Sequence, residues 1–180
     1  MKNAIILYWT NTGNTEKVAR AIEAGLISGG MQTSLVKYED AGSIDFFDFD
    51  LVCIGAPSYS WHPPKPVDDF LKERFQSYWN SGKVKLGSPR VPGKNALIFC
   101  TYSGNYTGIA EAIPTGLYMS QFFDHLGIEV VEEIYVLSEF RGSLENSTLG
   151  RMGDIRGLPT DDELNAISEK ARKVAKDIIG

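Results

Sequence analysis

Apolar and polar residues alternate along the chain in blocks that predict strands and helices by turns. Nearly continuous apolar runs at residues 4–9, 50–55 and 96–101 are typical of strands buried on both faces of a sheet. Residues 33–38 and 129–137 mix polar with apolar positions, so we expect these two strands at the edges. Strands that alternate with helices indicate an α/β fold with a parallel sheet covered on both faces.

Two helices are predicted from apolar side chains that recur at helical spacing. Residues 14–27 carry such a stripe directly after the first strand, and residues 160–179 carry another at the end of the chain. The second segment starts with Thr160 and Glu163, the pair of side chains that forms a capping box. The sequence therefore predicts both where the helix of residues 160–179 begins and which of its faces is apolar.

Two more helices are predicted between the central strands and the last strand. Residues 66–79 begin with a proline, which suits the first position of a helix. Pro114 interrupts residues 107–126, so we expect a short turn there, followed by a helix that ends at Gly127. The sheet should therefore have helices enough to cover both faces.

Composition and charge restrict the class of protein. A chain of 180 residues with 43% hydrophobic residues is most simply one domain over residues 1–180. The net charge of -5 argues against a nucleic-acid-binding protein, and no apolar run approaches the roughly 20 residues of a bilayer span, so we expect no membrane insertion. Cys53 and Cys100 form no metal-binding or disulfide pattern, which favours a reducing, cytoplasmic location.

The hexapeptide TNTGNT, residues 10–15, lies between the first strand and the first helix. Amide groups at a helix N-terminus and the helix dipole favour a bound anion, and Gly13 permits a close approach of the backbone. Threonine hydroxyls and the Asn14 amide add donors, whereas the loop has no Lys or Arg, and the chain has neither of the two common nucleotide motifs. We expect a phosphate group here; an N-cap with nothing bound is the alternative.

Polar and aromatic residues also follow the other two central strands. Residues 57–61 read PSYSW and residues 101–106 read TYSGNY. In an open parallel sheet, ligands bind beyond the carboxyl ends of the strands, where the strand order reverses. Flat aromatic side chains there could hold a planar ring between them, with the phosphate of the same molecule on the hexapeptide. The pattern indicates a mononucleotide site for a molecule with a large ring.

The hexapeptide resembles the phosphate loop of the flavodoxin family, Ser/Thr-x-Thr-Gly-x-Thr directly after the first strand. Thr10, Thr12, Gly13 and Thr15 all match, and the spacing of the later loops agrees over most of the chain. The resemblance implies a flavodoxin-like three-layer αβα sandwich with a five-stranded parallel sheet in the order 2-1-3-4-5. It also implies bound FMN as the cofactor.

By the same resemblance, the loops after the second and third central strands flank the flavin. Tyr59 is expected near one ring face and Tyr106 on the other, with Trp61 as a weaker candidate for the first face; core packing or a surface lid is the alternative for each. The expected cofactor-binding residues are Thr10, Asn11, Thr12, Gly13, Asn14, Thr15, Pro57, Ser58, Tyr59, Ser60, Trp61, Thr101, Tyr102, Ser103, Gly104, Asn105 and Tyr106.

The chain departs from the family in three ways. Flavodoxins commonly have a glycine near the flavin N5, where Ser60 stands here, so we expect weaker stabilisation of one-electron-reduced flavin. The flanking loops contain no Asp or Glu, whereas His62 and Lys65 lie beside the first, which predicts a higher potential for the fully reduced state. Trp9 precedes the phosphate loop, where the family often has a small residue, and it either packs inward or covers the site.

Two long irregular segments, residues 80–94 and 138–159, carry basic side chains. Loops of this length in a compact domain are usually functional or mobile. The first could dock a redox partner and the second could contact a nucleotide or a partner; exposure to water is the alternative for both. The residues concerned are Lys83, Lys85, Arg90, Lys94, Arg141, Arg151 and Arg156.

Three functions are compatible with these features. The first is a soluble electron carrier in which FMN passes electrons between redox partner proteins and no side chain is catalytic. The second is an FMN-dependent NAD(P)H or quinone oxidoreductase, with a substrate pocket under residues 56–66 and 138–159. The third is an interaction module that has lost the cofactor, against which the intact hexapeptide argues.

Overall fold

Five parallel strands form one sheet in the order β2-β1-β3-β4-β5 in the computed structural model, which describes residues 1–42 and 44–180. The strands are β1 (Asn3–Tyr8), β2 (Gln32–Lys37), β3 (Leu51–Pro57), β4 (Asn95–Tyr102) and β5 (Glu129–Leu137). β1, β3 and β4 are almost wholly buried, while β2 and β5 alternate exposed and covered positions. The predicted central and edge strands and their order are confirmed.

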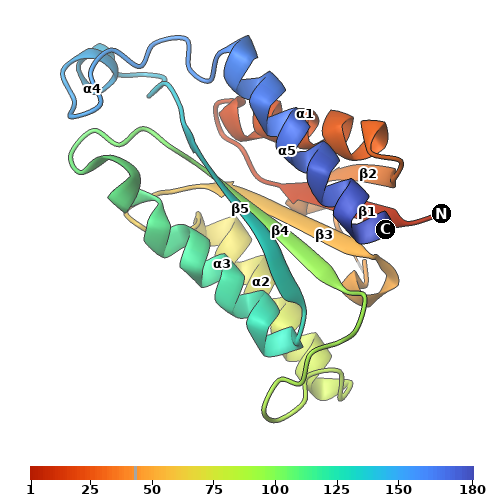
Figure 1. Ribbon diagram of the computed structural model, residues 1–180. Helices are drawn as coiled ribbons and strands as arrows, with labels where there is room; N and C mark the ends of the chain where they lie inside the picture. The colour runs from red at the N-terminus through yellow and green to blue at the C-terminus, as the bar shows by residue number, and fades with distance from the viewer. Residues whose placement is uncertain (43) are drawn as a thin grey trace.

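Helices cover both faces of the sheet, which gives three layers (Figure 1). α1 (Asn14–Ser28) and α5 (Asp161–Ile179) lie on one face, and α2 (Lys65–Asn80) and α3 (Ile113–Leu126) lie on the other. Each face has its own cluster of buried apolar side chains. Shorter helices are η1 (Tyr38–Asp40), η2 (Phe46–Asp48), η3 (Gly108–Glu111) and α4 (Leu144–Thr148), and of these only the turn at η3 was expected.

The ends of the helices follow the sequence signals. Glu163 accepts a hydrogen bond from the Thr160 amide at 2.7 Å, and the Glu163 amide donates to the Thr160 hydroxyl at 3.3 Å, so the capping box is formed. Gly127, at φ 73°, ends α3 in the left-handed conformation. None of the helices in the described ranges combines the length and the apolar character that a bilayer span requires.

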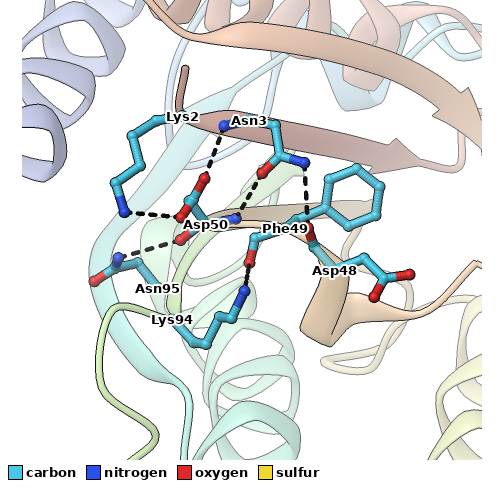
Figure 2. A network of polar contacts seen from close by, with 7 residues as sticks. All are labelled: Lys2, Asn3, Asp48, Phe49, Asp50, Lys94 and Asn95. Carbon is cyan, nitrogen blue, oxygen red and sulfur yellow. Dashed lines mark hydrogen bonds and ion pairs between the residues drawn. The ribbon is translucent and has the colours of Figure 1, made fainter.

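Hydrogen bonds join the amino ends of the central strands (Figure 2). The carboxylate of Asp50 accepts from Lys2 Nζ at 2.8 Å and from the Asn3 amide at 2.9 Å, while Asn95 donates to the Asp50 carbonyl at 3.2 Å. Burial by itself would raise the pKa of Asp50, but the bonds from Lys2 and Asn3 outweigh it and hold that pKa below its usual range. This network ties the central strands together at their amino ends, opposite to the carboxyl ends where the ligand is expected.

The basic loop of residues 80–94 leads into the amino end of β4, and its charges are largely used within the protein. Lys83 pairs with Asp45, Arg90 donates to Asp124 at 3.2 Å, and Lys94 donates to the Phe49 carbonyl at 2.9 Å. These contacts attach the loop to the body of the protein. Because the loop lies at the amino end of the strand, a partner docked on it would sit far from the opposite edge.

Candidate cofactor site

A cavity of about 720 Å³ opens at the carboxyl ends of the strands, within the range of roughly 300–1,000 Å³ that ligand sites usually have. All three segments predicted to bind the cofactor meet in it. The predicted residues that line the cavity are Thr10, Asn11, Thr12, Asn14, Thr15, Pro57, Ser58, Tyr59, Ser60, Trp61, Thr101, Tyr102, Ser103, Asn105 and Tyr106. Gly13 and Gly104 do not line it; both hold positive φ and shape the turns that do.

The phosphate loop leaves the amides at the start of α1 open. Gly13 precedes the helix at φ 92° and no side chain caps it. The Thr10 hydroxyl accepts a hydrogen bond from the Gly13 amide at 2.9 Å, which bends the loop over the helix end. Within the described ranges, no hydrogen bond takes up the amides of Asn14, Thr15 or Glu16. Amides at a helix N-terminus with no protein acceptor suit an anionic ligand.

Asn14 is only 5% exposed, and one of the two polar atoms of its side chain lacks a hydrogen-bond partner among the described residues. Its nitrogen donates to the Glu139 carbonyl at 3.0 Å, which joins the phosphate loop to the segment that follows β5. Its oxygen accepts no hydrogen bond from any described residue. A buried acceptor without a donor costs about 1–3 kcal/mol, so a ligand hydroxyl or water that donates to it would be favourable.

The hydroxyl of Thr15 was expected as a free donor, but it is already engaged. It lies 2.9 Å from the hydroxyl of Thr101 at the end of β4, and both residues are buried. A pair of hydroxyls uses one hydrogen between them, so one hydrogen remains for a ligand. The pair also connects the phosphate loop to the second flanking loop.

The first flanking loop is a two-residue hairpin. Tyr59 and His62 exchange backbone hydrogen bonds of 2.8 and 3.1 Å, and the residues between them, Ser60 and Trp61, have φ of 49° and 66°. Two successive positive φ values are those of a type I′ turn, whose central positions favour Asn and Gly. L-residues there cost roughly 1–2 kcal/mol each. This turn places the exposed Tyr59 and Trp61 side chains at the cavity.

Trp9 supports this loop from behind. Its ring centroid lies 5.9 Å from that of Tyr59, and the two planes are nearly perpendicular, at 88°. Edge-to-face contacts of this kind contribute about 0.5–1.5 kcal/mol. Trp9 is half-buried against the core and does not line the cavity, so it packs inward and holds Tyr59 in place.

The second flanking loop carries Tyr102 and Tyr106. Burial raises the pKa of the Tyr102 phenol, which therefore stays neutral at physiological pH, whereas Tyr106 is 78% exposed at the rim. The segment after β5 packs directly on this loop, because Arg151 donates its amide to the Asn105 carbonyl at 2.7 Å. A Cβ added to Gly150 would lie 2.9 Å from the Asn105 Cα, so the two backbones nearly touch.

Six residues outside the expected cofactor-binding set also line the cavity: Thr107, Glu111, Ser138, Glu139, Phe140 and Arg141; the last four lie in residues 138–159, where a substrate pocket was expected for an oxidoreductase. The last four directly follow β5, the strand beside β4. Applying the carboxyl-end rule to β5 as well as to the central strands would have found them. Glu111 had no such signal, because it lies in η3 beyond the loop and reaches back.

The structure also changes the expected charge of the site. Glu111 and Glu139 bring two acidic residues to a cavity that was expected to have none near the flavin. Lys65 is paired with Asp69 at 2.6 Å, and His62 packs its ring 4.5 Å from that of Tyr118; neither residue lines the cavity. These two acids lie outside the flanking loops from which the higher potential of the fully reduced state was expected and act against it, so that potential stays a prediction.

The chain is similar to known proteins in sequence and in structure. The model of a flavodoxin domain matches residues 5–152, well over half of the chain. The flavodoxin of Megasphaera elsdenii is 29% identical over 97 residues, and that of Clostridium beijerinckii is 26% identical over 98. Each match covers 54% of this chain and less than two thirds of the relative, 63% and 62% respectively.

Solved structures share the fold over nearly the whole chain. A flavodoxin from the domain Archaea has a TM-score of 0.65 and 16% identity, with 99% of both chains covered. A WrbA-like flavodoxin from Agrobacterium tumefaciens has a TM-score of 0.67 and 14% identity, covering 99% of this chain and 98% of that one. At such low identity these similarities support the fold alone.

Flavodoxin-family proteins bind FMN, and the residues at this cavity fit that cofactor. Open amides at the start of α1 suit its phosphate, the orphaned Asn14 oxygen suits a hydroxyl, and Tyr59 and Tyr106 offer aromatic surface for its ring. The strand order of the sheet, the phosphate loop and the matching domain model together show that the chain belongs to the flavodoxin family.

Proposed function

We propose that this protein is an electron carrier that exchanges electrons with redox partner proteins through bound FMN. The observation that carries the proposal is the combination of a phosphate loop whose helix amides have no protein acceptor among the described residues with an open aromatic rim. Tyr59, Trp61 and Tyr106 are 46%, 62% and 78% exposed, so the ring end of the cavity faces solvent. A cofactor held there is accessible to another protein.

The proposed binding residues hold and orient the cofactor. The amides at the start of α1 bind the phosphate, and Ser58 and Thr101 fix the two flanking loops through hydrogen bonds, since the Ser58 amide donates to the Thr101 carbonyl at 2.9 Å. FMN, when bound, supplies the capacity to accept and release electrons. The buried Cys53 and Cys100 take no part, because burial raises the pKa of both thiols far above neutral.

A second candidate is an FMN-dependent oxidoreductase that acts on NAD(P)H or a quinone. It is favoured by the part of the cavity formed by Ser138, Glu139, Phe140 and Arg141, which adds an apolar ring and a cation beside the cofactor residues. No ion pair of Arg141 occurs in the described part of the chain, so its charge is free to meet an anionic group. Carrier and oxidoreductase differ in whether a small molecule reduces the flavin directly.

The test is a stopped-flow comparison with FMN-loaded protein under anaerobic conditions. A carrier, once reduced by dithionite, should pass electrons rapidly to a one-electron acceptor protein such as cytochrome c, and mixing with NADH, NADPH or a quinol should reduce the flavin only slowly. Rapid flavin reduction by NAD(P)H, followed by reoxidation with a quinone, would reverse the order of the two candidates. An Arg141→Ala variant of a carrier should pass electrons to cytochrome c at the same rate as the wild-type protein.

A further inference from the structure

Glu111 contacts both walls of the cavity at once. Its carboxylate accepts hydrogen bonds from the amides of Tyr106 and Thr107, at 2.8 and 2.7 Å, in the second flanking loop. Its carbonyl accepts from the Ser58 hydroxyl, at 2.5 Å, in the first. Two loops that come from different strands and are about fifty residues apart in the chain therefore converge on one residue.

We propose that Glu111 is the positioning residue that sets the separation of the two aromatic walls and so preorganises the cavity for the flavin ring. The inference rests on the proposed role of the cavity as the FMN site. Glu111 acts through Tyr106 and Ser58, and its role is to orient them. The sequences of the two flanking loops do not reveal that Glu111 connects them through hydrogen bonds.

The chemistry of the contact suits this role. Two successive amides that point at one carboxylate oxygen form charge-assisted hydrogen bonds, which are shorter and stronger than those between neutral groups. Among the described residues, no other side chain forms a hydrogen bond with the backbone of Tyr106, which is 78% exposed. Ordering a loop before the ligand arrives removes that entropic cost from binding.

The other hydrogen bonds of the second flanking loop hold its backbone on either side of Tyr106 and Thr107. Gly104 and Gly108 hold φ of 65° and 71° at its two ends, and the Gly108 amide donates to the Gly104 carbonyl at 3.1 Å. Glycines at positive φ close the loop but give little rigidity, since they have the widest backbone freedom. The Arg151 amide holds the Asn105 carbonyl, and the Glu111 carboxylate holds the next two amides, those of Tyr106 and Thr107, so it contributes directly to how the Tyr106 side chain is presented to the cavity.

The first experiment measures FMN binding to the apoprotein of three variants and the wild type by isothermal titration. Glu111→Met keeps the volume and removes the acceptor, and we expect its dissociation constant for FMN to rise on the order of tenfold, the equivalent of one hydrogen bond. Glu111→Gln keeps an acceptor oxygen and should restore most of the affinity. Glu145→Met is the matched control and should bind like wild type, because Glu145 is exposed in α4 and its side chain forms no hydrogen bond with any described residue.

A spectroscopic readout separates positioning from general stability. In Glu111→Met the quenching of flavin fluorescence and the visible circular dichroism of bound FMN should both weaken, while Glu111→Gln and Glu145→Met keep the wild-type spectra. Wild-type affinity and spectra in Glu111→Met would overturn the inference and leave the FMN site intact. Failure of the wild-type protein itself to bind FMN would overturn the site and the inference together.

Amide hydrogen exchange in the wild-type protein decides the matter if Glu111→Met loses its native fold. The inference predicts that the amides of Tyr106 and Thr107 are protected before FMN is added, because Glu111 already holds them. Exchange of these two amides as fast as that of an unstructured loop, with protection only after FMN is added, would overturn it.

Discussion

Of the three non-glycine residues with positive φ in the described ranges, Ser60 and Trp61 lie at the rim of the cofactor cavity, whereas Ser88 lies in the loop of residues 80–94. Ser60 and Trp61 both occupy the left-handed region, although neither is a glycine or an asparagine. The sequence indicated Ser60 as the residue that replaces the usual glycine, but not that the turn already holds it at positive φ. That the one-electron-reduced flavin is less stabilised than in other flavodoxins remains a prediction.

Ser60→Gly should stabilise the protein. The left-handed penalty of roughly 1–2 kcal/mol disappears, and it exceeds the extra unfolded-state entropy of a glycine, roughly 0.5–1 kcal/mol, so a net gain of about 0.5 kcal/mol is expected. Urea unfolding of the apoprotein measures it. Ser60→Ala keeps the Cβ and the penalty, so it should show no gain; equal stability of the two variants would contradict the assignment of strain.

Patterns of apolar residues in the sequence predicted the strands and the long helices, but they could not predict contacts between distant segments. Strands β1, β3 and β4 were recognised because residues covered on both faces must be apolar, and α5 because its stripe and its capping box agree. Contacts between distant segments left no such trace. The hydrogen bond from the Ser58 hydroxyl to the Glu111 carbonyl, and the use of Lys83 as a partner of Asp45, depend on tertiary geometry that no local period encodes.

At the amino end of the sheet, the Asp50 network predicts a pH-dependent stability. Because the folded-state pKa of Asp50 is lowered, its contribution is present above the unfolded-state pKa, near 4, and is lost as the pH falls through the folded-state value. We expect Asp50→Asn to lower the free energy of unfolding by about 1 kcal/mol at pH 7, a low value for charged hydrogen bonds because the group is partly exposed.

Urea unfolding between pH 7 and pH 2 tests this expectation. The gap between wild type and Asp50→Asn should narrow as the pH falls below 4, since the wild-type carboxylate is then protonated. Glu129→Gln, an exposed position on β5 without a side-chain hydrogen bond in the described part of the chain, serves as the control and should shift little. A gap that is constant with pH would show that the charge of Asp50 does not contribute.

For the whole molecule, one sheet shared by two apolar cores should unfold as a unit. We propose that residues 1–180 form one cooperative domain, because each core packs against the same five strands. The helices α1 and α5 pack especially closely. A Cβ on Gly25 would lie 2.1 Å from the Ser168 carbonyl oxygen and 2.8 Å from the Ala171 Cβ, so no side chain fits there without moving a helix.

Gly25→Ala should therefore destabilise the protein although alanine favours helices. Overpacking costs about 1–3 kcal/mol, and this clash with backbone puts it at the upper end, so it outweighs the gain in helix propensity of about 1 kcal/mol. Thermal unfolding should show a single transition at lower temperature. Ser28→Ala at the exposed end of the same helix should be neutral or slightly stabilising. Stabilisation by Gly25→Ala, or two separate transitions, would contradict the packing.

The measurement that tests the central claim most directly is the affinity of the apoprotein for FMN and for riboflavin, which has the same ring without the phosphate. The amides at the start of α1, which have no protein acceptor among the described residues, predict that FMN binds tightly and that riboflavin binds on the order of a hundredfold more weakly. Equal affinity for the two, or binding of neither, would contradict a phosphate site at residues 10–15 and with it the proposed FMN site.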